Sequence, residues 1–151
     1  GRVLAASSEE VRLLGPIYEP SLVQTLRRHS ILYAHGHRVG GTNPSLLEAM
    51  GAGNPVLAHD NRFNRWVAGE SAAYFSDVQS CGDAFDRLLR DEAALARMSR
   101  AALERAAGTF AWTDVLHAYL CVLTDVHSWA HGEPSWPRVP RPQLREQEIN
   151  Q

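Results

Sequence analysis

The chain has 151 residues, of which 44% are hydrophobic, and its formal net charge is −2. This length suffices for one domain with a buried core, and the near-balanced charge argues against a nucleic-acid binder that relies on a basic surface. Cys81 and Cys121 lie far apart in different predicted helices, which indicates neither a disulfide framework nor a zinc motif. No apolar run approaches the roughly 20 residues that span a bilayer, and no signal peptide is visible. We therefore expect a reducing, cytoplasmic setting.

Short strands and helices alternate along most of the chain. In chain order we predict a buried strand at 11–14, a helix at 21–29, a strand at 31–34, a helix at 44–52, a strand at 55–58, a helix at 62–68, a strand at 72–75, and helices at 81–90, 92–107 and 112–130. This alternation predicts an α/β fold, a Rossmann-like parallel sheet built from right-handed βαβ units with helices on both faces. Residues 131–151 are rich in proline and arginine, and we expect them to be disordered or draped on a surface.

The stretch 39–60, V-G-G-T-N-P-S-L-L-E-A-M-G-A-G-N-P-V-L-A-H-D, is the most informative. Gly40 and Gly41 permit positive φ and close approach of a ligand to the main chain. Asn43 is a preferred N-cap and Pro44 suits the first helical position, so a helix begins here. We expect the N–H groups of Ser45 and Leu46, in the first turn of this helix, to face outward. The helix dipole favours a phosphate or diphosphate at that position.

Glu48 lies one turn further into that helix. A carboxylate there can accept two hydrogen bonds from a sugar diol. The pattern Ser45-x-x-Glu48 also matches a capping box, in which Glu48 bonds the N-cap backbone instead of a ligand. That alternative places Pro44 outside the helix.

Polar residues follow each predicted strand, at 15–18, 35–43, 59–64 and 76–77. The carboxyl ends of parallel strands share one edge of a sheet, so we expect these segments to line one crevice. Four of these residues have side chains that can bind a metal, which is an alternative to a ligand-binding crevice, although hydrogen bonding is their more ordinary role. They are His35, His37, His59 and Asp60.

From about residue 11 to 120 the sequence resembles the later part of the nucleotide-binding domain of family-4, GT-B fold glycosyltransferases. The form H-G-H-x-V-G-G-T-N-P-S-L-L-E-A-M is most similar to bacterial rhamnosyltransferases of capsule and O-antigen synthesis. The matching residues are Leu14-Gly15, Tyr33 to His37, Gly40 to Met50, Gly53 to Val56, Ala58 to Asn61 and the Phe-x-Trp at Phe110 to Trp112.

The resemblance implies roles for individual residues. In the family two glutamates seven residues apart flank the glycines, and the second binds the ribose hydroxyls. Glu48 matches the second and Gly40 takes the place of the first, so backbone, His37 or Asn43 must do whatever the first glutamate does near the donor sugar. Gly40, Gly41, Thr42, Asn43 and Ser45 are implied to hold the diphosphate, and Ile17 and Tyr18 to contact the base.

The resemblance also implies the reaction. The family transfers a hexose or deoxyhexose from a nucleoside-diphosphate sugar to a growing polysaccharide or lipid-linked acceptor, and the most similar subgroup suggests dTDP-rhamnose as the donor. The family's reaction retains the anomeric configuration of the sugar and requires no metal or other cofactor. We expect residues 1–130 to be a partial nucleotide-sugar domain of a parent enzyme, a fragment that is inactive without the acceptor domain. Its setting is expected to be cytoplasmic, with a peripheral place at the inner membrane face as one option. Arg38 and Arg65 supply some positive charge, but neither matches the family's basic clamp.

Two alternatives remain. The first is a binding or interaction module without activity, which fits the departure at Gly40. An NAD enzyme fits less well, because no G-x-G-x-x-G opens a first βα turn. We also expect Trp112 to anchor the core. The last helix is expected to expose Tyr119, Leu123 and Val126 for lack of the family's first domain, and so to favour a homodimer.

Overall fold

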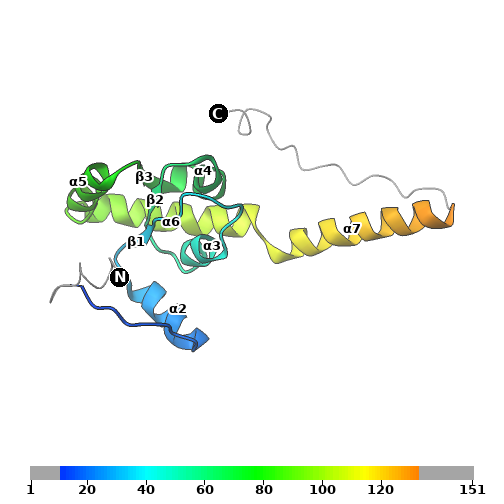
Figure 1. Cartoon of the computed structure of the whole chain (residues 1–151), viewed down its shortest axis with the longest axis horizontal. Coiled ribbons are helices and arrows are strands. Elements are labelled where there is room, and N and C mark those ends of the chain that lie inside the picture. The colour runs from blue at the N-terminus through cyan, green and yellow to red at the C-terminus, as the bar shows by residue number, and fades with distance from the viewer. Residues whose placement is uncertain (1–10, 133–151) are drawn as a thin grey trace.

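The computed structural model describes residues 11–132, and its centre is a three-stranded parallel sheet in the order β1-β2-β3 (Figure 1). Tyr33 lies opposite Val56, which in turn lies opposite Ala72. The elements are α2 (Pro20–His29), β1 (Tyr33–His35), α3 (Pro44–Gly51), β2 (Val56–His59), α4 (Arg62–Ala68), the 3-10 turn η1 (Gly69–Ser71), β3 (Ala72–Phe75), α5 (Val78–Leu88), α6 (Glu92–Thr109) and α7 (Trp112–His131). The predicted α/β architecture is confirmed.

The two faces of β2 build two separate cores. Side chains alternate along a strand, so Val56 and Ala58 point to one face and Leu57 to the other. The first face packs with buried residues of α3, α4 and α6, and the second packs with α5 and the start of α6. Every one of these three β2 side chains is fully buried, as a strand covered on both faces requires.

Helix α6 joins the two cores. Leu95, near its start, packs with Leu57, whereas Ala102 belongs to the cluster around Val56. Further along, Arg105 donates hydrogen bonds to the main-chain carbonyls of Trp66 and Val67 at the end of α4. The helix therefore holds the second half of the domain together.

Most predicted boundaries lie within two residues of the observed ones. The largest shift is in α5, which begins at Val78 and not at residue 81. Asp77 Oδ1 accepts a hydrogen bond from the Ser80 N–H at 2.7 Å, and the Ser80 hydroxyl oxygen accepts one from the Asp77 N–H at 3.1 Å. This reciprocal capping box satisfies the first turn and so starts the helix earlier than its apolar periodicity indicates.

The predicted strand at 11–14 is wrong. Val11, Leu13 and Leu14 are exposed, and the segment is irregular. Within the described residues it pairs with no strand, so its backbone groups are left to bond water and the ladder that defines a strand does not form. The expectation of a disordered or draped tail falls on residues 131–151, of which only His131 and Gly132 are described.

Helix α7 continues from α6 and points away from the body of the domain (Figure 1). Trp112, expected in the core, is 76% exposed. Phe110 takes the anchoring role instead, because its ring packs edge-to-face on Trp66 with centroids 5.4 Å apart. The exposure expected for Tyr119, Leu123 and Val126 is confirmed.

The helical stretch Glu92–His131 is long and apolar enough to cross a membrane by length and composition. The sequence has no uninterrupted apolar run there, because Asp114 and Asp125 interrupt the apolar residues of α7. None of its most apolar window is buried. A single helix of this kind is weak evidence of a membrane span.

Candidate functional site

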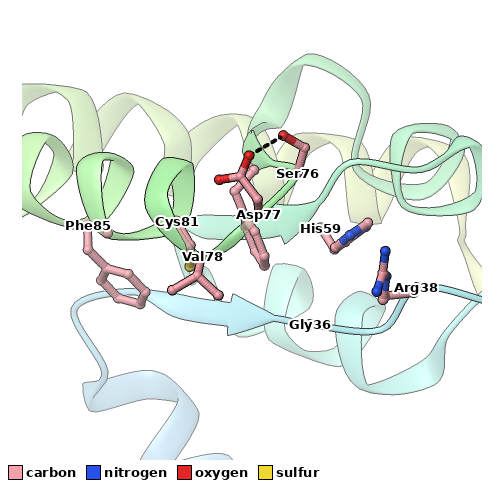
Figure 2. Close-up of a pocket in the computed structure, with 10 residues that line it drawn as sticks. Gly36, Arg38, His59, Ser76, Asp77, Val78, Cys81 and Phe85 are labelled. Atoms are coloured by element: carbon pink, nitrogen blue, oxygen red, sulfur yellow. Dashed lines mark hydrogen bonds between the residues drawn. The ribbon is translucent and has the colours of Figure 1, made fainter.

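A pocket of about 450 Å³ lies at the carboxyl ends of the strands (Figure 2). The strands end at His35, His59 and Phe75, on one edge of the sheet. Val78, Cys81 and Phe85 of α5 form one part of its lining, whereas Arg38 and His59 lie at the other end of the view. The remaining lining residues are Gly36, Ser76, Asp77 and Gly82. The predicted crevice is therefore confirmed in part.

The segment 15–18 does not join this pocket. Tyr18 is 89% exposed and precedes α2, which lies to one side of the sheet in Figure 1. Because 11–14 is not a strand, its end is not at the sheet edge. The role of Ile17 and Tyr18 at the base stays a prediction.

The glycine loop leads directly into α3. Gly40 has φ +144°, a conformation that side-chain-bearing residues rarely adopt, and open space surrounds both Gly40 and Gly41. Asn43 is the N-cap and Pro44 the first helical residue, as predicted. The loop can therefore present main-chain atoms to a ligand without a side chain in the way.

The first turn of α3 uses part of its own donor set. Asn43 Oδ1 accepts hydrogen bonds from the Ser45 N–H at 3.1 Å and the Ser45 hydroxyl at 2.7 Å. The Leu46 N–H donates to the Asn43 carbonyl at 3.1 Å. The expectation that the N–H groups of Ser45 and Leu46 are free is therefore wrong, because the cap satisfies them. Among the described residues, no hydrogen bond uses the N–H groups of Gly41, Thr42 or Asn43.

Glu48 forms an ion pair with Arg27 of α2, with 2.6 Å between Nη2 and Oε2. The Arg27 side chain is nearly buried, but that of Glu48 is half exposed. The capping-box alternative is excluded, since Asn43 is the N-cap and Glu48 lies beyond the first turn. Sequence inspection missed Arg27, because the pair joins two helices and leaves no local pattern.

Two amides fix the loop that carries His37. Asn61 and Asn64 each donate from Nδ2 to the His37 carbonyl at 3.0 Å. Asn64 also donates to the His59 carbonyl at 2.8 Å, which ties the ends of β1 and β2 together. Asn61 caps α4 with its Oδ1 as well. His37 therefore lies on an anchored loop.

The two arginines differ in their availability. Arg65 binds Asp60 through two hydrogen bonds of 2.5 and 2.8 Å and lies over the Tyr74 ring. The hydrogen bond from Arg65 lowers the pKa of Asp60. Arg38 forms no ion pair with another described residue and lines the pocket. Of the two, Arg38 is the charge available to a ligand.

Of the two histidines at strand ends, His35 is buried and His59 is half-buried. His35 is 1% exposed, stacks on His37 with centroids 4.8 Å apart and leaves Nε2 without a partner. Both ring nitrogens of His59 are buried and have no partner among the described residues, so the hydrogen-bonding role expected of this side chain is not filled there. No group of three or more His, Cys, Asp or Glu side chains is placed to hold a metal within residues 11–132.

We expect the stability of the chain to fall as the pH drops below about 6.5. Burial, followed by the charge on His37, lowers the pKa of His35 from 6.5. On acidification the unfolded chain therefore binds this proton first, so the stabilisation is complete above pH 6.5 and lost below it. Urea unfolding on both sides of this pH checks the effect. His35→Gln is expected to weaken the pH dependence, whereas the exposed control His29→Gln is expected to preserve it; equal behaviour of the two variants contradicts the assignment.

Comparison with known proteins adds the family. A search of curated proteins and a search of solved structures found no match to this chain. A family model described as "Glycosyl transferase-like" matches residues 2–120, which include the sheet, the glycine loop and helices α2 to α6. A match over most of the chain, together with the α/β fold, establishes the relationship: the chain belongs to the glycosyl transferase-like family.

Proposed function

We propose that the chain is the donor-binding part of a retaining, GT-B family-4 glycosyltransferase. It binds a nucleoside-diphosphate sugar, with dTDP-rhamnose as the proposed donor, and the sugar passes to a polysaccharide or lipid-linked acceptor held by another domain. The proposed setting is the cytoplasm, at the inner membrane face. Membership of the glycosyl transferase-like family supports the reaction class.

The arrangement of the glycine loop and α3 carries this proposal. The N–H groups of Gly41, Thr42 and Asn43 lie at the N-terminus of an eight-residue helix, in the loop that follows the carboxyl end of β1. A helix N-terminus carries about half a positive charge and favours an anion. In the proposed complex these three donors hold the diphosphate. The Ser45 hydroxyl becomes a fourth donor when its O–H turns from Asn43 Oδ1 to the diphosphate.

Glu48 is the proposed ribose ligand. Its pair with Arg27 occupies Oε2 and fixes the carboxylate, while half of the side chain stays open to a ligand. A ribose diol donates two hydrogen bonds to such a carboxylate, and bonds to a charged acceptor are stronger than neutral ones. Arg27 thus positions Glu48 for the ribose.

Catalysis at this site is proposed to be electrostatic. As the bond to the diphosphate breaks, negative charge grows on the leaving group, and donors fixed in advance stabilise it. The loop N–H groups and Arg38 supply that stabilisation. His37 and Asn43 are the proposed side chains near the sugar, in place of the family's first glutamate at Gly40.

The conformation of Gly40 favours a second candidate, a binding module without activity. Its φ of +144° is strained for any other residue, so a glutamate does not fit this backbone. A protein that abandoned catalysis has no need of that carboxylate. This candidate predicts nucleotide binding without sugar transfer.

Isothermal titration with dTDP, UDP, GDP and NAD tests the proposal directly. We expect one nucleoside diphosphate to bind selectively and Glu48→Ala to weaken it by about 1–3 kcal/mol, or roughly 5- to 150-fold, the value of a lost charged hydrogen bond. The matched control is Glu104→Ala, an exposed glutamate of α6, which is expected to leave binding unchanged.

The outcomes separate the candidates. Equal affinity in the Glu48→Ala and Glu104→Ala variants contradicts the ribose role. Preferential binding of NAD contradicts the donor site as a whole. Selective binding of a nucleoside diphosphate, with no transfer or hydrolysis of its sugar by the parent protein, favours the inactive module.

A further inference from the structure

Helix α7 has an apolar stripe with the spacing of a coiled coil. Successive positions are four, three, four, three and four residues apart, which is the repeat of a seam between two paired helices. We define the α7 stripe as Trp112, Leu116, Tyr119, Leu123, Val126 and Ala130. All six are exposed. Among residues 11–132 no helix covers this stripe, and an open apolar surface of this kind is typical of an interaction site.

We propose that the α7 stripe pairs with the same stripe of a second copy of this chain, in antiparallel orientation. The stripe carries no charge, because Asp114 and Asp125 lie at other positions of the repeat. An uncharged apolar surface is complementary to itself, as a two-fold interface requires. Helix α7 also points away from the body over its 20 residues, about 30 Å (Figure 1). Most of its side chains are exposed, and Ser128 is its one buried residue.

The exposed area suffices for a stable dimer. A standard interface buries about 800 Å² per partner. Trp112, Tyr119 and the flanking Trp129 are 67–85% exposed, and an aromatic side chain can bury about 150–250 Å². Scaled by these exposed fractions, the three side chains contribute on the order of 300–600 Å². Exposed aliphatic residues beside them supply the remainder: Leu116, Leu120, Val122, Leu123 and Val126.

The order of side chains fixes the register. A two-fold axis at residue 121 pairs each residue before this position with the residue of the second copy that lies equally far after it. Trp112 then faces Ala130 of the second copy, the largest side chain against the smallest. Leu116 faces Val126 and Tyr119 faces Leu123 in the same way. Alternation of large and small side chains fills a helix interface without voids.

Sedimentation equilibrium of the whole chain at several concentrations tests the pairing. We expect the mass to rise from 16.7 kDa to twice that value. Leu123→Glu places an unpaired charge in the seam and is expected to weaken association by about 100-fold or more. The matched control Ala118→Glu adds the same charge on the opposite face and is expected to stay within about fivefold of the unchanged chain.

Disulfide trapping tests the register without a destabilising charge. In a Cys121→Ser background, Leu116→Cys combined with Val126→Cys is expected to give a covalent dimer on oxidation, and Leu116→Cys alone is not. In an antiparallel pair the two copies of position 116 are about 15 Å apart along the axis, too far for a bond. A covalent dimer from the single variant means parallel helices and overturns the register.

A chain that stays monomeric at every concentration overturns the pairing itself. Co-sedimentation of that monomer with phosphatidylglycerol vesicles then assigns the stripe to a lipid surface, in line with the length and composition of Glu92–His131. An unchanged dimer in the Leu123→Glu variant likewise overturns the proposal, because it places the interface elsewhere.

Discussion

Leu57→Ala is expected to lower the free energy of unfolding by about 2–5 kcal/mol, the range for removing a large apolar side chain from a rigid core. Leu57 is fully buried at the centre of β2, between β1 and β3. Its side chain packs with Ala84, Leu88 and Leu95, which come from two helices. Since β2 is held on both sides, the surrounding residues have little freedom to close the cavity. Urea unfolding monitored by circular dichroism measures the loss.

The matched control for this prediction is Leu89→Ala. Leu89 is 51% exposed at the end of α5, so the same chemical change is expected to lower stability by less than about 1 kcal/mol. A similar loss of unfolding free energy in the two variants contradicts the tight packing around β2. It indicates instead that the sheet is loosely packed.

Gly69→Ala is expected to lower the free energy of unfolding by about 2–4 kcal/mol, through backbone strain and the loss of buried hydrogen bonds. Gly69 ends α4 with φ +50° and ψ −136°, a region that glycine alone adopts readily. A Cβ at this position lies 2.9 Å from Arg105 Cζ. Arg105 must then move, and its bonds of 2.7 and 2.5 Å to the carbonyls of Val67 and Trp66 are weakened. Thermal and urea unfolding both report the change.

The control variant Gly82→Ala is expected to change the free energy of unfolding in the opposite direction. Gly82 lies within α5 and has open space around it, so alanine there is expected to stabilise the chain by about 0.5–1 kcal/mol. A Gly69→Ala variant as stable as the unchanged chain contradicts the role of the Arg105 contact in joining α6 to α4.

The candidate site was predictable where its cause is local. Asn43-Pro44 starts α3 whatever surrounds it, since a cap and a fixed φ act within one turn. The turn at Gly40 is equally local. The ion pair between Arg27 and Glu48 was not predictable, because it depends on how α2 lies against α3. The satisfied N–H groups of Ser45 and Leu46 depend on the cap geometry, which residue types alone do not specify.

The alternation of strands and helices can be read from the order of residues alone, and the parallel sheet and the edge where polar residues gather follow from it. These follow from apolar periodicity and from turn residues, which act over a few neighbours. Which segments are covered depends instead on how distant parts of the chain pack together. Residues 11–14 have the apolar character of a strand but no ladder partner among the described residues, and Trp112 has the character of a core residue but lies on a helix that leaves the body. Burial requires a second surface at the right distance, and that surface is supplied by residues far away in the chain or by another molecule.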